Sequence, residues 1–385
     1  MFKGLFPLAL ATFAVGTDGF VIAGLLQPIA ADLGVSLPAA GQLVTAFALT
    51  FALSAPVLGV ATAGMSRRAA LLIALGIFVI GNAATALGTT YAVVMTARVL
   101  TAAGAGIIGT AAFSVAAAIA PPHRRGRALA LVMGGLTTAT AIGLPLGTLI
   151  GRADWRTTLW AVAGLGLVAG AGIVLGVPPV RSPAVAFGDR LAPLKQGWVI
   201  GALAVTMITL AGIHTLYTYI GPALSNATDG SLTALTIVLL AWGVGTVIGN
   251  FLAGRLTDRY SSRRVLTLCL SVSVIVLLVG PSATAHLAST LVWAVLWGVC
   301  VGMPVIPQQH RLATHAPAAM PALLGLVSSA IYIGIALGGG IGGLAQQWIT
   351  PPLLSLPAAA ITALAPMPFS LASRWFVKVH RACGC

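Results

Sequence analysis

Long apolar stretches alternate with short polar gaps along the whole chain. About twelve such stretches occur, and each is close to the ~20 residues that an α-helix needs to cross the hydrocarbon core of a bilayer. They cover residues 5–30, 40–62, 69–88, 92–119, 128–151, 157–177, 197–223, 232–256, 265–283, 288–309, 323–346 and 352–373. The two-residue alternation of a transmembrane β-barrel is absent. Because only helices and closed barrels satisfy their backbone in lipid, the pattern predicts an all-α membrane protein with twelve transmembrane helices.

The composition indicates a polytopic membrane protein rather than a soluble domain. Of the 385 residues, 58% are hydrophobic and 7% are charged, whereas a soluble domain carries about 25% charged residues. The mean hydropathy is +1.03. The 46 glycines fit transmembrane helices whose backbones approach one another closely through small residues.

The net charge of +14 does not indicate a nucleic-acid-binding protein, because the positive residues gather in the short gaps between apolar stretches. With the N-terminus inside, the outer gaps hold only Arg152 and Arg156. The inner gaps hold Lys3, Arg67, Arg68, Arg124, Arg125, Arg127, Arg181, Arg190, Lys195, Arg255, Arg259, Arg263, Arg264, Arg311, Arg374, Lys378 and Arg381. Since cytoplasmic loops are rich in Lys and Arg, we expect a multi-pass protein of the cytoplasmic membrane with both termini in the cytoplasm.

Nothing in the sequence indicates a metal site or an enzyme. Cys269, Cys300, Cys383 and Cys385 do not have metal-ligand spacing. No Ser-His-Asp, His-Glu-x-x-His or paired-carboxylate pattern occurs in the apolar stretches. We therefore expect no metal, no cofactor and no enzymatic activity.

The longest polar gap, residues 178–196, divides the chain into two halves with similar patterns. The segment Gly59 to Arg68 after the second stretch resembles the segment Gly254 to Arg264 after the eighth. The fifth and eleventh stretches are both rich in glycine. Two parallel six-helix repeats are a transporter architecture. We expect two pseudo-symmetric six-helix bundles, residues 1–177 and 197–385, joined by a cytoplasmic linker of residues 178–196.

Asp18 is the one acidic residue near the middle of an apolar stretch. The chain has six acidic residues, all Asp, and the other five fall between apolar stretches or at their ends. A carboxylate in the bilayer core costs a few kcal/mol on insertion scales. It is retained only if it faces a wet cavity, pairs with a cation or keeps its proton. Each arrangement suits a group that binds and releases protons.

Five stretches, two of them copies of one loop pattern, together resemble the drug:proton antiporter family with twelve spans, a branch of the major facilitator superfamily, and in particular its chloramphenicol-resistance and sugar-efflux members. These stretches are the loops Gly59 to Arg68 and Gly254 to Arg264, the segment Arg98 to Gly106, the motif Gly143-Leu-Pro145-Leu-Gly147, and the first stretch with Gly16-Thr17-Asp18-Gly19-Phe20. The resemblance covers almost the whole chain. It implies the major facilitator fold, a membrane location and a monomer.

The chain departs from the family pattern in two places. The acidic residue is Asp18, while Gly19 stands where the family tends to have Glu, and a shift of one residue turns a side chain by about 100° around a helix. The first gating loop has Ala63 and Gly64 where the family has an Asp-Arg pair, whereas the second loop keeps Asp258 and Arg259. The gating charge is therefore expected mainly in the C-terminal half.

The resemblance implies proton-coupled efflux of small neutral drugs such as chloramphenicol by alternating access, with protons, the substrate and membrane lipid as partners. Efflux of sugars or nucleosides and passive facilitation stay open as alternatives. A membrane-embedded enzyme is the competing class, and it lacks a motif in this sequence.

Asp18, Arg98 and His214 are the proposed proton-coupling residues. At 1.5 Å per helical residue they lie roughly 10–18 Å below the outer ends of their stretches, in one layer. A carboxyl group that meets Arg in one state and an apolar surrounding in another would load and release a proton. The alternatives are a packing group bonded to Thr or Ser for Asp18, a tie to backbone carbonyls for Arg98, and a donor that lines the cavity for His214.

Two further sets of residues are expected in the transport path. Polar or aromatic side chains at mid-depth are the candidates for substrate binding: Thr17, Phe20, Thr45, Phe113, Thr137, Thr138, Tyr217, Tyr219, Trp242, Asn250, Gln308 and Tyr332. The gating candidates are Arg67, Arg68, Gly143, Pro145, Gly147, Asp258, Arg259 and Arg263. Static packing of the glycines and a purely topological role of the loop charges are the alternatives. The predicted cavity is poor in charge, which favours neutral substrates.

Overall fold

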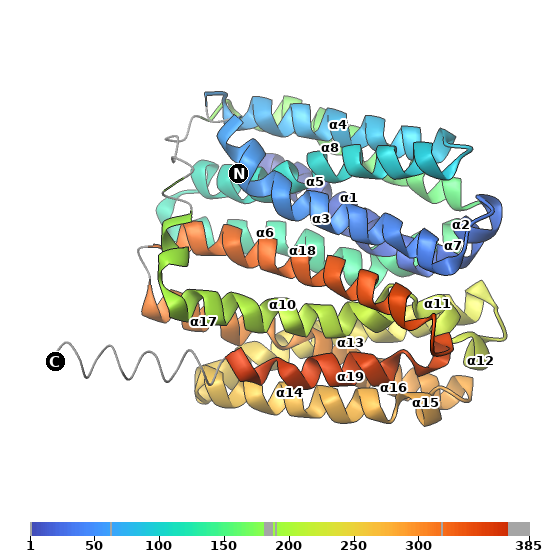
Figure 1. Ribbon diagram of the computed structural model, residues 1–385. Helices are drawn as coiled ribbons and strands as arrows, with labels where there is room; N and C mark the ends of the chain where they lie inside the picture. The colour runs from blue at the N-terminus through green and yellow to red at the C-terminus, as the bar shows by residue number, and fades with distance from the viewer. Residues whose placement is uncertain (1, 62–63, 181–187, 189–190, 317–318, 369–385) are drawn as a thin grey trace, which may run out of the picture. The chain divides into compact units, whose positions relative to one another are not determined.

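The structure is a computed structural model, and it describes residues 2–61, 64–180, 188, 191–316 and 319–368 (Figure 1). Within these ranges the chain forms helices and no strand, which confirms the all-α prediction. Among the predicted features, Ala63, Cys383, Cys385, most of the linker after Val180 and the end of the last stretch from Phe369 onward lie outside the described residues.

The helices of the first half follow the first six predicted stretches. They are α1 (Phe2–Gly24), α2 (Leu26–Asp32), α3 (Leu37–Ala61), α4 (Arg67–Leu87), α5 (Tyr91–Ile119), η1 (Pro122–Arg124), α6 (Arg125–Thr138), the π-helix η2 (Ala139–Gly143), α7 (Leu144–Ile150) and α8 (Trp155–Gly176).

The second half follows the remaining stretches. Its helices are η3 (Ala192–Lys195), α10 (Gly197–Tyr217), α11 (Ile220–Ala223), α12 (Ser225–Thr228), α13 (Leu232–Arg259), α14 (Ser262–Leu278), α15 (Gly280–Ala283), α16 (Leu287–Gly302), α17 (Val305–His315), α18 (Met320–Ala345), η5 (Pro351–Leu353) and α19 (Ser355–Leu364).

Ten helical stretches of the described chain are long and apolar enough to cross a membrane. They match ten of the twelve predicted spans. The other two predicted spans contain α14, with 17 residues, and α19, with 10 residues. The stretch 265–283 does not continue as one helix, because it breaks at Val279 just before Pro281, whose nitrogen has no hydrogen to donate. The same break precedes Pro222 after α10 and Pro304 after α16.

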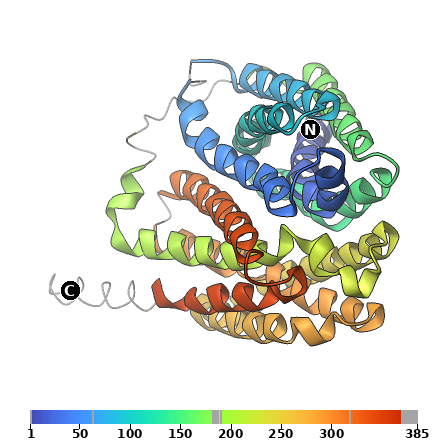
Figure 2. The same ribbon diagram turned by 45° about the vertical axis from the view of Figure 1, so that its right-hand side comes forward.

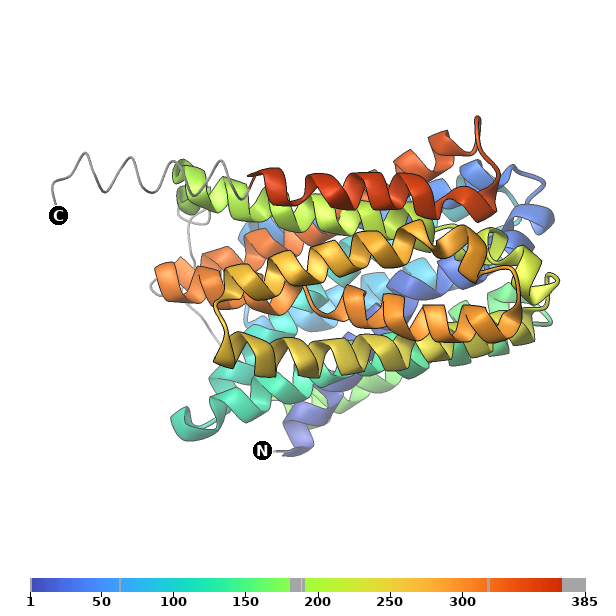
Figure 3. The same cartoon turned by 90° about the horizontal axis from the view of Figure 1, so that it is seen from below.

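Contacts between Cα atoms divide the chain into two compact units. Unit 1 contains Met1–Val185 and Gly230–Leu240, and unit 2 contains Ala186–Asp229 and Ala241–Cys385. In unit 1, α1 packs on α5, α6, η2, α7 and α8, and Figure 2 shows α1 in dark blue among these helices. In unit 2, α10 packs on α18 and α19, and Figure 3 shows α10 in green alongside α19 in red. In both units, the first long helix therefore contacts the glycine-rich fifth span and the last span.

Matching serine caps start the third predicted span and the ninth. The Ser66 hydroxyl accepts a hydrogen bond from the Ala69 backbone nitrogen at 3.2 Å. The Ser261 hydroxyl accepts one from the Arg264 nitrogen at 3.5 Å. Such caps satisfy backbone N–H groups that the first turn of a helix leaves unpaired. The repeated loops thus share a local structural role as well as a sequence pattern.

Glycine lets the first long helix of each unit approach its partner closely. In unit 2, a side chain on Gly334, Gly338 or Gly342 would collide with backbone carbonyls of α10. In unit 1, a side chain on Gly135 would collide with the Ala9 carbonyl of α1. Small residues at such crossings are the usual means of tight helix packing in membranes.

Candidate functional site

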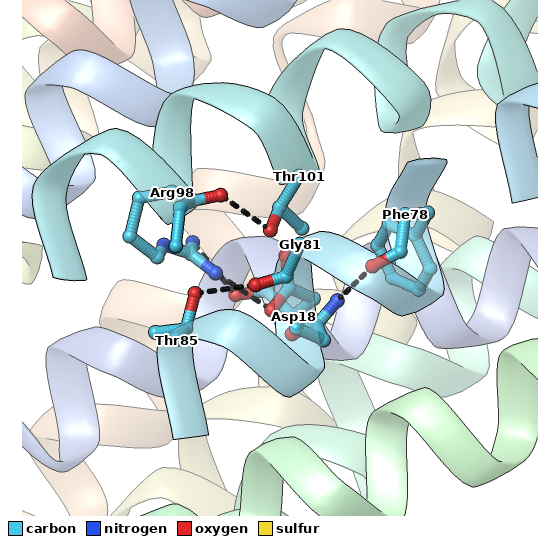
Figure 4. Close-up of polar contacts among 8 residues, drawn as sticks. Asp18, Phe78, Gly81, Thr85, Arg98 and Thr101 are labelled. Atoms are coloured by element: carbon cyan, nitrogen blue, oxygen red, sulfur yellow. Dashed lines mark hydrogen bonds and ion pairs between the residues drawn. The ribbon is translucent and has the colours of Figure 1, made fainter. Parts of the chain in front are cut away.

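An ion pair between Asp18 and Arg98 lies inside unit 1. The Arg98 Nη1 atom donates to Asp18 Oδ1 at 2.7 Å, and Nη2 lies 3.5 Å from the Asp18 backbone carbonyl oxygen. The two side chains are 0% and 1% exposed. Figure 4 shows the pair between α1 and α5, with groups of α4 beside it. The displaced acid of the first span therefore meets the arginine of the fourth.

The guanidinium of Arg98 has a second partner in an aromatic ring. Its Cζ atom lies 4.3 Å from the ring centroid of Phe47 on α3, a distance at which a cation is attracted to the ring face. Within the described part of the chain, Asp18 Oδ2 and Arg98 Nε have no hydrogen-bond partner. Asp18 Oδ2 can therefore accept, and Arg98 Nε can donate, one further hydrogen bond. A group that exchanges a proton or binds water needs such an open position.

The hydroxyl groups near the pair are used by their own helices. Thr101 and Thr85 donate to the carbonyl oxygens of Ala97 and Gly81, both at 2.8 Å (Figure 4). Asp18 is thus bonded by Arg98, and not by the Thr or Ser that the packing alternative requires. The alternative role of Arg98 is a structural tie to backbone carbonyls. The structure shows one such contact, because the Arg98 Nη2 atom also lies near the Asp18 backbone carbonyl of α1.

The Gly143-Pro145 motif packs on the turn of α1 that carries Asp18. A side chain on Gly143 would collide with the Thr17 hydroxyl, and one on Gly147 would collide with Val21. The motif lies where the helix widens to a π-helix, in which the Leu144 N–H bonds the Ala139 carbonyl. Such π-turns are frequent at functional sites. The sequence predicted a bend from Pro145 but gave no signal for the π-helix.

His214, the third predicted coupling residue, lies in unit 2. Its Nδ1 atom is 3.0 Å from the Leu210 carbonyl oxygen, which only accepts, so Nδ1 carries a proton. The imidazole meets the Tyr217 ring edge-on, with 5.4 Å between centroids. The side chain is buried at 4% exposure. Within unit 2, His214 is thus part of an aromatic environment.

Tyr217, Trp242 and Trp297 form a buried aromatic cluster in unit 2, called here the aromatic cluster. Tyr217 lies 4.8 Å from Trp242 and 6.5 Å from Trp297, and the two indole rings are 5.8 Å apart, all between ring centroids. Sequence reasoning included Tyr217 and Trp242 but missed Trp297. The signal for it is the four-residue spacing of Trp293 and Trp297, which places both rings on one face of α16.

The other substrate-binding candidates are divided between unit 1 and unit 2. Tyr219 donates to the Gly339 carbonyl at 2.9 Å, and Gln308 donates to the Ala202 carbonyl at 2.8 Å. Thr17 is buried, and Thr138 is exposed. The remaining candidates are half-buried: Phe20, Thr45, Phe113, Thr137, Asn250 and Tyr332.

The gating candidates of the two repeated loops differ in their contacts. In the first loop, Arg68 Nη2 donates to the Val174 carbonyl near the end of α8 at 2.6 Å. The Arg67 backbone nitrogen donates to the Val180 carbonyl at 2.7 Å. In the second loop, Asp258 is exposed, and no arginine or lysine of the described ranges forms an ion pair with it. Arg259 and Arg263 are also exposed.

The Major Facilitator Superfamily model matches this sequence twice, over residues 8–221 and 202–382. The chain belongs to the major facilitator superfamily. Members of this family are membrane transporters and not enzymes, so the chain is a multi-pass transport protein.

Curated relatives of this major facilitator protein come from both Bacillus subtilis and Streptomyces lividans. It is 35% identical to the uncharacterized MFS-type transporter YbcL of Bacillus subtilis (strain 168), over 88% of this chain and 87% of that protein. It is also 35% identical to a chloramphenicol resistance protein of Streptomyces lividans, over 74% and 73% of the two chains.

Solved structures of the family share the fold. The crystal structure of a D-xylose-proton symporter superposes with a TM-score of 0.78 at 17% identity, over 96% of each chain. An inward-facing bacterial homologue of the lysosomal transporter Spinster gives a TM-score of 0.76, also at 17% identity, over 97% of each chain. This likeness confirms the predicted fold class.

Proposed function

We propose that this transporter exports small neutral compounds, of the kind represented by chloramphenicol, in exchange for protons and by alternating access. The observation that carries the proposal is the buried pair of Asp18 and Arg98. Two charges out of water are costly, and a membrane protein retains them mainly where they serve ion or proton movement. Asp18, Arg98 and His214 are the proposed proton-coupling residues.

Asp18 could couple proton movement to transport by alternating between an ion pair with Arg98 and a protonated, neutral form. While Arg98 bonds Asp18, the carboxylate is held in its charged form by its partner. If a change of state separates the two side chains, the carboxylate is left in an apolar surrounding and takes up a proton. Entry of one proton down a membrane potential supplies about 2.3 kcal/mol per 100 mV, before any pH gradient. That is enough to drive a neutral compound against a considerable gradient.

Neutral substrates follow from what surrounds the candidate residues. The aromatic cluster of unit 2 offers ring faces, and the one buried acid of unit 1 is already bonded to Arg98. A phosphorylated or strongly cationic compound would lack a counter-charge at these positions and would lose its hydration. The chloramphenicol resistance protein of Streptomyces lividans supports the drug class. The substrate-binding candidates given above belong to this proposal.

The orientation and the gates complete the proposal. Both termini lie in the cytoplasm, the first and second bundles are residues 1–177 and 197–385, and the protein works as a monomer. Movement at Gly143, Pro145 and Gly147 would change the turn of α1 that carries Asp18, because the motif packs on it. The loop arginines and Asp258 would exchange partners as the cytoplasmic side opens and closes.

Transport into liposomes tests the proposal. Proteoliposomes receive a pH gradient and radiolabelled chloramphenicol, D-xylose or a nucleoside. We expect the pH gradient to drive uptake of chloramphenicol by the wild type, and Asp18→Asn to lower that uptake at least tenfold while counterflow exchange continues. Asp32→Asn is the matched control, since Asp32 is half-exposed and bonds Arg156 at 2.8 Å.

Three outcomes of this experiment would decide between proton-coupled drug efflux, transport of sugars or nucleosides, and passive facilitation. Uphill uptake by Asp18→Asn equal to that of the wild type would contradict proton coupling through Asp18. If the pH gradient drives uptake of D-xylose or the nucleoside but not of chloramphenicol, the protein transports those compounds and the proposed drug class is wrong. Transport that never exceeds equilibrium would show a passive facilitator.

A further inference from the structure

Two buried indole N–H groups of unit 2 have no acceptor among the described residues. The Nε1 atoms of Trp242 and Trp297 lack a hydrogen-bond partner among the residues that the structure describes, and the two side chains are 3% and 2% exposed. Leaving a buried donor unpaired costs about 1–3 kcal/mol. Native proteins hold few such groups, and each one calls for an explanation.

The other described tryptophans do not share this feature. Trp155, Trp198 and Trp293 donate to Asp32, Gln196 and the Val276 carbonyl. Trp160 and Trp348 are 47% and 77% exposed, so solvent or lipid headgroups can reach them. The unpaired donors therefore coincide with the aromatic cluster and with no other described tryptophan.

Close packing of α13 and α16 holds the two indoles in place. A side chain on Gly298 of α16 would collide with the Trp242 carbonyl, and one on Gly245 of α13 would collide with the Val295 carbonyl. The two backbones are thus in contact directly beside Trp242 and Trp297. Neither indole can satisfy the other, because an indole nitrogen donates and does not accept.

The surroundings of the two donors are aromatic. Tyr217 lies 4.8 Å from Trp242 between centroids, and Trp293 stacks on Trp297 at 5.1 Å with an interplanar angle of 24°. His214 contacts Tyr217 at its edge. A ligand here would meet flat apolar faces and N–H donors, which together recognise an uncharged molecule with oxygen acceptors.

We propose that Trp242 and Trp297 bind the transported compound, with their N–H groups donating to its oxygen atoms while the rings contact its flat or apolar body. The inference rests on the proposed transport of small neutral compounds and names their chemistry: a nitro, carbonyl or hydroxyl oxygen beside an uncharged body. A cation would face two N–H donors instead of acceptors. An anion would find no cationic side chain among the rings that form the cluster.

Equilibrium binding to the purified protein at fixed pH tests the inference. The probes are radiolabelled chloramphenicol, which joins a flat ring to a nitro group, and D-xylose, which carries hydroxyls without an aromatic ring. Trp242→Phe and Trp297→Phe keep an aromatic ring and remove the donor. We expect each to raise the Kd of the bound probe about tenfold, the loss of one hydrogen bond at roughly 1.4 kcal/mol.

Two controls separate the donor from the fold. Trp160→Phe changes an exposed indole and should bind as the wild type does. Trp198→Phe removes an N–H that already has the Gln196 side chain as its acceptor, so it should leave the Kd within twofold. Where Phe at 242 or 297 prevents folding, benzothienylalanine incorporated there keeps the shape of indole and replaces N–H by sulfur. The same tenfold loss is expected.

The outcomes distinguish this inference from the proposed function. Wild-type affinity in both donor variants would overturn it and would show that only ordered water satisfies the two N–H groups. Failure of the wild type to bind either probe would overturn the substrate class. Asp18→Asn should still bind the probe, because the inference does not involve proton coupling. Unchanged binding in the donor variants, together with lost pH-driven uptake in Asp18→Asn, would leave the proposed function standing without this site.

Discussion

Unit 1 and unit 2 use similar helix packing but place different chemistry inside it. In both, the first long helix crosses a glycine-rich fifth span closely, and serine caps start the equivalent third and ninth spans. Unit 1 buries the charged pair of Asp18 and Arg98, while unit 2 buries the aromatic cluster. The comparison teaches that the scaffold is repeated and the side-chain chemistry is not. If the proposals for the two units hold, proton coupling through Asp18 and substrate recognition by the aromatic cluster should be separable by mutation.

Unit 1 also contains an exposed acid–arginine pair, and comparing it with the buried pair shows how burial changes the contribution of an ion pair to stability. Asp32 and Arg156 are 2.8 Å apart, and their side chains are 40% and 22% exposed. A surface pair of this kind contributes about 0–1 kcal/mol. A buried pair that loses one partner costs about 3–5 kcal/mol, because the other charge is left without compensation.

The largest effect is expected from breaking the buried pair. Arg98→Ala should lower the stability of the folded protein by about 3–5 kcal/mol, or prevent its accumulation, because Asp18 loses its cation. Arg156→Ala should cost less than about 1 kcal/mol. Thermal unfolding in detergent, followed by circular dichroism, measures both.

A neutral double variant sharpens this test. Asp18→Asn with Arg98→Gln removes both charges and should recover most of the stability that Arg98→Ala loses, while pH-driven uptake stays absent. If Arg98→Ala were as stable as Arg156→Ala, removing the cation of a buried pair would cost no more than removing that of an exposed pair, and the effect assigned to burial would be contradicted.

An intermediate effect is expected from filling the helix crossing of unit 1. Gly135→Ala places a methyl group against the Ala9 carbonyl, and overpacking of this kind costs about 1–3 kcal/mol. Gly134→Ala is the matched neighbour, since a side chain there meets nothing within 4 Å. It should be neutral or stabilise by up to about 1 kcal/mol, because Ala favours a helix over Gly. Melting temperatures of the two variants in detergent measure the difference.

The same comparison can be made in unit 2. Gly338→Ala would place a methyl group against the Ala211 carbonyl, and Gly340→Ala meets open space. If both crossings serve the same packing role, the destabilisation should match that of the pair in unit 1. Equal melting temperatures for Gly338→Ala and Gly340→Ala would contradict the structural equivalence of the two units.

The smallest effect on stability is expected at the cytoplasmic loop of the second half. Asp258→Asn changes an exposed side chain without an ion pair in the described structure, so stability should stay within about 0.5 kcal/mol. If Asp258 exchanges partners during gating, the variant should change cysteine accessibility in this loop and the transport rate. Unchanged accessibility would restrict Asp258 to a topological role.

The sequence predicted the helices because apolar length is a local signal. It also predicted Asp18 as the central acid, since no other acid lies in the middle of a span, and it placed Arg98 at a similar depth. The predicted stretch 265–283 was too long as a single helix, because the helix breaks at Val279 just before Pro281.

Rotation of the helices about their axes could not be predicted in the same way. The helices α5 and α10 are apolar on nearly all sides, so no polar face indicates which residues point toward which neighbour. The bond from Arg98 to Asp18 and the ring contacts of Trp297 depend on this rotation. The π-helix before Pro145 likewise depends on packing against α1, which is a contact between distant parts of the chain.

Proton movement driven by a substrate gradient tests the central claim most directly. Proteoliposomes that enclose a pH-indicator dye receive a chloramphenicol gradient and no imposed pH gradient, and the internal pH is followed. The account predicts that the wild type and Asp32→Asn move protons against the direction of the compound, and that Asp18→Asn moves none. Equal proton movement in Asp18→Asn and the wild type, or movement of the compound without protons in the wild type, would contradict it.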